Sequence, residues 1–279
     1  MLRPSEREYY PTIVATDFSV GINRIPFVLT DIEGNYLDDQ EVLVKIWRIE
    51  DSAGHEPKYI NSEYHEIQSK TAHLHEDGSV HEHNQKKGFY LLTNVDIENP
   101  GLWTAEFFVE AKRNVTIEQQ AFFEVRDSSI TIGIGEYAPL TNNSVLEKGI
   151  AFSSISSRNV DTDDLHQLSV KQAIKTKLPL MLVFASPRFC VSALCAPVVD
   201  LVEELQAEFG QRSNFIHIEP WELSIARSDG RLITSVSARE WNLPSEPWIF
   251  LVGSDGRVRA KFEGPTSEVE LTEALLKLL

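Results

Sequence analysis

Cys190 and Cys195 are the two cysteines of this chain of 279 residues, and they lie in the stretch FASPRFCVSALCAP. The apolar run LPLMLVFAS leads into this stretch, and the run APVVDLVEELQAEFG, with apolar residues at helical spacing, follows it. A thiol pair of this kind can form a redox-active disulfide or hold a metal ion. It can also be two small buried residues, because free cysteine is among the most buried residue types.

The C-x4-C spacing constrains the redox alternative. Residues five apart in a regular α-helix have Cα atoms roughly 8–9 Å apart, whereas a disulfide requires Cα atoms within about 7 Å. A bond between the cysteines therefore requires Cys190 to lie in the loop before the helix, or the first turn to unwind on oxidation. We expect Cys190 at or just before the first turn, where the helix N-terminus favours a thiolate and Arg188 adds positive potential.

A second stretch whose side chains could bind a ligand is TAHLHEDGSVHEH, here called the histidine hairpin. It contains His73, His75, His81 and His83. The turn signal EDGS separates two H-x-H strands, whose side chains alternate between faces. An odd number of loop residues would put the four imidazoles on one face, as a site for copper, zinc or nickel, with His65 as a fifth neighbour. An even number of loop residues would place the two pairs of imidazoles on opposite faces of the hairpin. The alternatives are a solvated hairpin that binds nothing and a pH-sensitive contact.

Length and charge limit the classes of protein that contain these residues. The length predicts two domains. The formal net charge of −16 argues against nucleic acid as a partner, since that affinity depends on Lys and Arg, and against an anionic membrane surface. No apolar run reaches the roughly 18–20 residues of a membrane span. The N-terminus has no signal-peptide pattern, which predicts a cytoplasmic protein, or an extracytoplasmic one if the N-terminus is truncated.

Residues 1–127 have the pattern of an all-β domain. In WTAEFFVE, the residues Trp103, Ala105, Phe107 and Val109 alternate with more polar ones. The runs EVLVKIW, RIPFVLT and IEQQAFFEV are further strand-like segments, separated by turn signals such as ENPG. This pattern predicts an antiparallel β-sandwich, immunoglobulin-like in broad architecture.

The pattern changes towards the C-terminus. Residues 128–165 are rich in Ser, Asn, Asp and Thr, and we expect a linker there that wraps onto the second domain. In residues 166–279 helices and strands alternate in the order α-β-α-β-α-β-β-α, and LPLMLVFA is apolar throughout, as expected of a strand buried on both faces. The last segment, SEVELTEALLKLL, is an amphipathic helix with Ser267 placed to cap it. The second domain is therefore expected to be α/β.

Residues 166–279 resemble the thioredoxin-like superfamily in this element order and in two local features. The cysteine stretch lies where the first long strand meets its helix, which is the active-site position in thioredoxin-like proteins. LPSEPWIFLVGSDGRV resembles the thioredoxin segment in which a cis-proline opens the third strand. The resemblance implies that Pro247 is cis and shapes a cleft beside the cysteines, with Pro187, Arg188 and Glu246 lining it. The two-domain arrangement further resembles a bacterial group in which a β-sandwich precedes a thioredoxin-like domain.

The cysteine spacing departs from that of ordinary thioredoxins, which have C-x-x-C. Some Q-type peroxiredoxins carry C-x4-C, but their P-x-x-x-T/S-x-x-C motif is absent here, because Val183 and Pro187 stand at its Pro and hydroxyl positions. Sco-type copper chaperones use C-x-x-x-C with a distant histidine, for which His217 is a loose candidate.

The leading hypothesis is a thiol–disulfide oxidoreductase in which Cys190 attacks and Cys195 resolves, through a mixed disulfide at Cys190. Its partner would be a protein thiol or disulfide substrate or a reductant, no cofactor would be required, and the N-terminal sandwich would be a binding module. The second hypothesis is a metal-handling protein that holds copper or zinc at the histidine hairpin. The remaining alternatives are an atypical peroxiredoxin-like peroxidase and a non-catalytic interaction protein.

Overall fold

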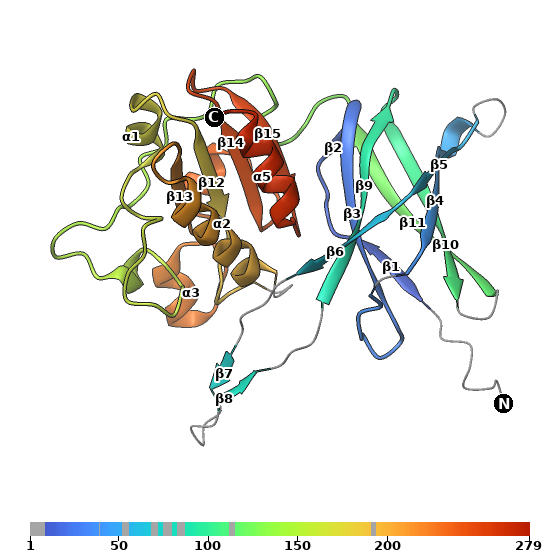
Figure 1. Cartoon of the computed structure of the whole chain (residues 1–279), viewed down its shortest axis with the longest axis horizontal. Helices are drawn as coiled ribbons and strands as arrows, with labels where there is room; N and C mark the ends of the chain where they lie inside the picture. The colour runs from blue at the N-terminus through green and yellow to red at the C-terminus, as the bar shows by residue number, and fades with distance from the viewer. Residues whose placement is uncertain are drawn as a thin grey trace. The chain divides into compact units, whose positions relative to one another are not determined.

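The structure is a computed structural model, and it describes residues 9–38, 40–51, 56–67, 72–74, 80–82, 87–111, 115–190 and 194–279 (Figure 1). The chain divides into two compact units, unit 1 (Met1–Ser129) and unit 2 (Ile130–Leu279). Unit 1 consists mainly of strands, and unit 2 combines strands with helices. No helix in these ranges is long and apolar enough to cross a membrane.

Unit 1 contains two larger sheets and a small hairpin. The first sheet has the strand order β1-β3-β9-β6, the second has the order β2-β11-β10-β4-β5, and β7 pairs with β8. The described strand pairs are antiparallel, except for the parallel pair of β2 with β11. The elements are β1 (Tyr10–Ile13), β2 (Phe18–Ser19), β3 (Gly21–Thr30), β4 (Val42–Arg48), the 3₁₀ turn η1 (Ile49–Asp51), β5 (Lys58–Asn61), β6 (Glu63–Ile67), β7 (Ala72–Leu74), β8 (Val80–Glu82), β9 (Lys87–Ile97), β10 (Gly101–Ala111) and β11 (Val115–Arg126).

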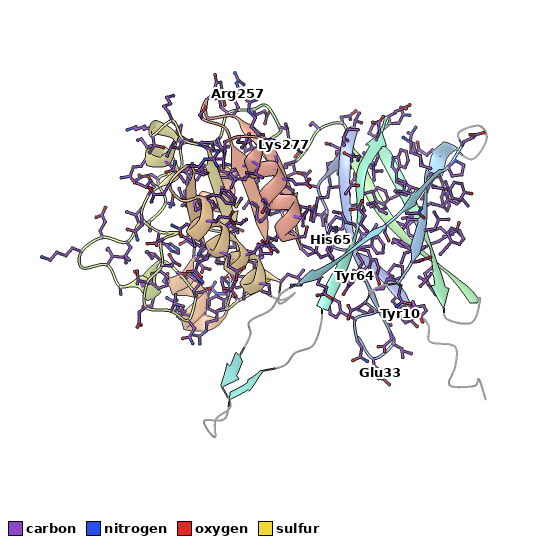
Figure 2. All side chains as sticks on the ribbon, viewed as in Figure 1. Tyr10, Glu33, Tyr64, His65, Arg257 and Lys277 are labelled. Atoms are coloured by element: carbon purple, nitrogen blue, oxygen red, sulfur yellow. A yellow bond between two sulfur atoms is a disulfide. The ribbon has the colours of Figure 1, made fainter. Side chains whose placement is uncertain are left out.

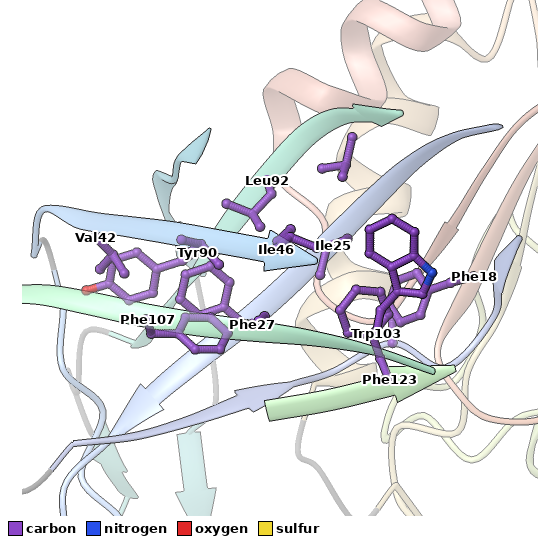
Figure 3. Packing of buried hydrophobic residues seen from close by; sticks show 14 of the residues in the cluster. Phe18, Ile25, Phe27, Val42, Ile46, Tyr90, Leu92, Trp103, Phe107 and Phe123 are labelled. Carbon is purple, nitrogen blue, oxygen red and sulfur yellow. The ribbon is translucent and has the colours of Figure 1, made fainter. Parts of the chain in front are cut away.

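The two larger sheets of unit 1 share one hydrophobic core (Figure 3). Trp103, Ala105, Phe107 and Val109 on β10 are all buried, which confirms the face predicted for this strand. The ring centroid of Phe107 lies 4.8 Å from that of Phe27, which comes from β3 in the other sheet. Apolar side chains that alternate along the strands therefore hold the two sheets together.

Unit 2 has a four-stranded sheet in the order β13-β12-β14-β15. β12 is parallel to β13 and antiparallel to β14, and β14 forms an antiparallel pair with β15. The predicted element order is present, with the additional helix α3. The elements are the 3₁₀ turn η2 (Phe152–Ser154), α1 (Val170–Lys175), β12 (Leu180–Phe184), α2 (Cys195–Phe209), β13 (Asn214–Ile218), α3 (Leu223–Asp229), α4 (Val236–Glu240), β14 (Trp248–Val252), β15 (Val258–Glu263) and α5 (Glu268–Leu276).

Strand β12 is buried on both faces, as its continuous apolar run predicts. Met181 and Val183 pack in one core with residues of α2 and α5, which lie together over one face of the sheet (Figure 1). Leu182 and Phe184 pack in a second core with residues of α1. β12 is thus a central strand fixed from both sides, and the loop that leaves its carboxyl end contains Cys190.

The sequence predicts a linker over residues 128–165 that wraps onto the second domain, and residues 130–165 pack within unit 2. Phe152 and Leu165 are buried. Tyr137 forms a β-bridge with Arg257, which is labelled in Figure 2, and the guanidinium carbon of Arg257 lies 3.9 Å from the centroid of the Tyr137 ring. The boundary between the two units therefore lies at the beginning of this segment.

Candidate functional site: a disulfide beside a partly buried carboxyl

Cys190 and Cys195 form a disulfide, with their Cα atoms 6.0 Å apart. Cys190 lies in the loop after β12, where its backbone N–H donates to the carbonyl of Ser186 at 3.0 Å. Helix α2 begins at Cys195, while residues 191–193 lie outside the described ranges. Of the two geometries that the spacing allows, this structure has the one with Cys190 in the loop. The first-turn position expected for Cys190 is corrected, because Cys195 occupies the helix N-terminus.

The two cysteines differ in exposure. Cys195 is completely buried, in the core that α2 forms with the sheet. Cys190 packs against the same core but remains partly exposed. A thiol that approaches from solvent therefore reaches the sulfur of Cys190 before that of Cys195.

Glu246 lies against the disulfide. One of its carboxyl oxygens and both sulfur atoms lie within 4.8 Å of one another. The indole N–H of Trp221 donates to Oε1 of Glu246 at 2.7 Å, whereas the buried Oε2 has no hydrogen-bond partner among the described residues. Burial raises the pKa of Glu246 to about 7, against the effects of hydrogen bonding from Trp221 and from the backbone of Ser186 and with a smaller contribution from the charge of Glu219.

The other residues assigned to the cleft are Pro247, Pro187 and Arg188. The Glu246–Pro247 peptide bond is cis, as the resemblance implies, and the carbonyl of Pro247 accepts a hydrogen bond from the N–H of Gly264 at 3.0 Å. Pro187 and Arg188 lie in the turn that leads to Cys190. Arg188 is exposed, and its backbone N–H donates to Ser157. This turn is therefore held in part by Ser157, from the segment before α1.

A buried carboxyl that the sequence analysis did not single out lies behind the cysteine loop. Oε2 of Glu219, just after β13, accepts a hydrogen bond from the hydroxyl of Ser186 at 2.7 Å, and Oε1 accepts one from the N–H of Ser157. Burial raises the pKa of Glu219, although these hydrogen bonds oppose the shift. The carbonyl of Ser186 in turn accepts from Cys190. In the sequence, Glu219 could have been found as the acidic residue that ends the apolar strand NFIHIE.

A second buried network contains the two histidines of unit 2. Asp163 accepts from Arg158 at 2.7 Å and from Nδ1 of His166 at 2.5 Å. Nε2 of His166 lies 3.2 Å from Nδ1 of His217, and Nε2 of His217 lies 2.8 Å from the carbonyl of Ala185. Because that carbonyl can only accept, Nε2 of His217 carries the proton.

The same network engages both ring nitrogens of His217. Burial, followed by the charge of His166, lowers the pKa of His217 to about 3, and both ring nitrogens are already engaged. The group that the structure places beside the two sulfurs is Glu246. His217, the loose candidate for a third ligand, is thus held in this network, and Glu246 is the candidate that lies beside the sulfurs.

The histidine hairpin lies in unit 1 and is described in part. β7 and β8 pair so that His73 lies directly opposite His81 in the backbone register, whereas His75 and His83 lie outside the described residues. His65, labelled in Figure 2, stacks on Phe89 with ring centroids 5.2 Å apart. The four-histidine metal site stays a prediction.

A polar pocket lies beside the buried carboxyl of Glu219. It has a volume of about 270 Å³, and His217, Glu219 and Trp221 line it together with serine and asparagine side chains such as Ser144 and Ser235. Trp221 is also the donor to Glu246. The pocket therefore lies next to Trp221, which hydrogen-bonds to Glu246 of the candidate site.

A scan against protein-family models gives no match for this chain, and a search of the curated proteins gives none either. The chemistry of the site is therefore inferred from its geometry.

Proposed function

We propose that this protein is a thiol–disulfide oxidoreductase that acts through Cys190 and Cys195. The observation that carries the proposal is the disulfide between one partly exposed and one fully buried cysteine at the start of a helix. Such a pair separates the two roles that exchange requires, because one sulfur is accessible to a partner while the other can react only within the protein.

Exchange at this site balances as two successive displacements. A thiolate of the partner attacks Sγ of Cys190, a mixed disulfide forms, and the Cys190–Cys195 bond breaks with its electron pair on Cys195. A second partner thiolate then attacks the mixed disulfide, which leaves the partner oxidised and both cysteines reduced. In the opposite direction Cys190 attacks a partner disulfide and Cys195 resolves it. The position of Cys195 at the N-terminus of α2 favours its negative charge as a leaving group.

The proposal includes the architecture of both units. We propose a thioredoxin-like fold for unit 2, supported by its element order, by the site at the end of β12 and by the cis bond before Pro247. We propose an immunoglobulin-like sandwich for unit 1, supported by its two sheets with a common core. Unit 1 would act as a binding module for the protein substrate.

Trapping of the mixed disulfide tests this proposal. In the Cys195→Ser variant the accessible Cys190 remains, and we expect it to form a mixed disulfide with glutathione disulfide that mass spectrometry detects. In the matched Cys190→Ser variant the remaining thiol is buried, so we expect the reaction to be at least about tenfold slower. The natural chain should also reduce a protein disulfide in the presence of dithiothreitol. Full disulfide-reductase activity in the Cys190→Ser variant would contradict the proposal.

A further inference from the structure

We propose that the reduced form of the same centre is a zinc site, in which Sγ of Cys190, Sγ of Cys195 and the carboxylate of Glu246 bind a divalent cation that oxidation releases. This inference goes beyond the exchange reaction proposed above. It requires that the Cys190–Cys195 disulfide can be reduced, but it does not require exchange with a protein substrate.

The geometry of the three groups fits a tetrahedral ion. Their ligand atoms lie within 4.8 Å of one another although they come from three separate places in the chain: the loop after β12, the start of α2 and the residue before Pro247. With a Zn–S bond of about 2.3 Å, two thiolates of one tetrahedral zinc ion lie about 3.8 Å apart. After reduction, the two sulfur atoms therefore need to move apart only to that distance to bind one ion. Three protein ligands leave the fourth position open to water or another ligand.

An unsatisfied oxygen is the second observation that points to a cation. Oε2 of Glu246 is buried and has no hydrogen-bond partner among the described residues, although buried polar atoms are normally paired. Reduction adds two acidic groups, of which the thiol of Cys195 lies in a fully buried place. The reduced centre must then be compensated by protons or by a cation. A divalent ion would compensate the charges of the two thiolates and would also bind the unpaired Oε2 of Glu246.

The ligand set selects the class of metal. Thiolates are soft ligands that calcium and magnesium avoid, whereas zinc binds thiolates and carboxylates together. The disulfide form offers no thiolate, so binding is confined to the reduced state. Release balances when a low-molecular-weight disulfide takes the electrons: the two zinc-bound thiolates become the Cys190–Cys195 disulfide, the oxidant becomes two thiolates, and Zn²⁺ leaves.

Cobalt and zinc titrations of the full chain test this inference. The disulfide is first reduced by a phosphine, which becomes the phosphine oxide with oxygen from water, and the phosphine is removed without air. Titration with Co²⁺ should then produce a thiolate-to-cobalt charge-transfer band in the reduced chain and none in the oxidised chain, and Zn²⁺ should abolish the band. The histidine hairpin is present in both redox states, so the oxidised chain controls for metal bound there.

Two carboxamide variants test the role of Glu246. Glu246→Gln should weaken zinc binding to the reduced chain by at least about tenfold, since loss of even an outer-sphere partner costs that much. The matched variant Glu273→Gln removes the same charge from an exposed position on α5 and should bind zinc as the natural chain does. Circular dichroism and formation of the disulfide in both variants check that they fold.

The outcomes separate this inference from the exchange reaction. Absence of the cobalt–thiolate band in the reduced chain would overturn the metal site, and so would equal zinc affinity of Glu246→Gln and the natural chain. Exchange measured in the presence of a chelator does not depend on these results. A metal-free chain that still exchanges disulfides would leave the proposed function standing, whereas a disulfide that no phosphine reduces would overturn both.

Discussion

Glu246 meets the two cysteines because of the way two strands pair. Phe184, the last residue of β12, lies opposite Trp248, the first residue of β14. In an antiparallel pair the end of one strand lies beside the beginning of the other. The loop to Cys190 and the segment with Glu246 therefore meet at one edge of the sheet. The cysteine pair is recognisable in the sequence itself, whereas the cis bond and the place of Glu246 beside the cysteines were expected only from the resemblance to thioredoxin-like proteins. The approach of a Glu246 oxygen to both sulfurs could not be predicted, because it depends on register between distant segments.

The buried His217 predicts a specific dependence of stability on pH. Burial and the charge of His166 lower its folded-state pKa to about 3, compared with about 6.5 in an unfolded chain. Between pH values of about 6.5 and 3 the unfolded chain therefore binds a proton that the folded chain excludes, so the free energy of unfolding falls as the pH falls. This one group can contribute at most about 1.4 kcal/mol per pH unit.

The variant His217→Asn isolates this contribution, because Asn can donate to the carbonyl of Ala185 but does not titrate. Urea denaturation between about pH 7 and pH 4 would give the free energy of unfolding of both proteins, and the advantage of the natural chain should shrink as the pH falls. The other titratable groups of this network, Arg158, Asp163 and His166, are present in both proteins. A constant difference across the pH range would contradict a neutral, buried His217.

At the scale of elements, short helices are where the sequence is least informative. α3 has seven residues, and only Leu223 and Ala226 among them are buried, which is too few to give a recognisable helical period. Its end is marked by Gly230 with a φ of 76°, a conformation that glycine adopts without strain. Helix α5 is the opposite case. Its cap at Ser267 is predicted from the sequence and confirmed, with a capping box to Glu270.

We expect the cap of α5 to contribute to the stability of unit 2. The hydroxyl of Ser267 accepts from the N–H of Glu270 at 3.3 Å, and the carboxylate of Glu270 accepts from the N–H of Ser267 at 3.0 Å. Ser267→Ala should lower the free energy of unfolding by about 1 kcal/mol, measured by urea denaturation. The control Ser254→Ala changes an exposed serine in the turn between β14 and β15. Equal effects of the two changes would count against the cap.

At the scale of the whole molecule, the sequence predicts an all-β domain over residues 1–127, a linker over residues 128–165 and an α/β domain over residues 166–279, whereas the two compact units meet at residue 129. Residues 130–165 are held to unit 2 by side chains from distant positions. Arg158 binds Glu203 on α2 at 2.6 Å, and Thr141 donates to Glu240 on α4 at 2.6 Å. Contacts of this kind leave no periodic pattern in the sequence, so the expectation that this segment wraps onto the second domain could not be extended to the residues that hold it there.

The separate cores predict that reduction acts on one unit. The core between the two sheets of unit 1 contains residues of that unit alone, and the disulfide borders a core of unit 2. A disulfide that closes so short a loop stabilises its unit by about 2 kcal/mol in the chain-entropy model. We therefore expect phosphine reduction, with a chelator present to keep the centre free of metal, to lower the free energy of unfolding of unit 2 by this amount. That of unit 1 should stay unchanged.

Hydrogen exchange followed by mass spectrometry across a urea series can assign each transition to its unit, because the peptides report residues 9–129 and 130–279 separately. The Cys190→Ser, Cys195→Ser double variant should reproduce the reduced chain and lose all response to the phosphine. If unit 1 were destabilised as much as unit 2, the two would unfold as one cooperative body, and the disulfide would support the whole chain. If neither unit responded, closing the loop would contribute nothing, and the disulfide would matter through its chemistry alone.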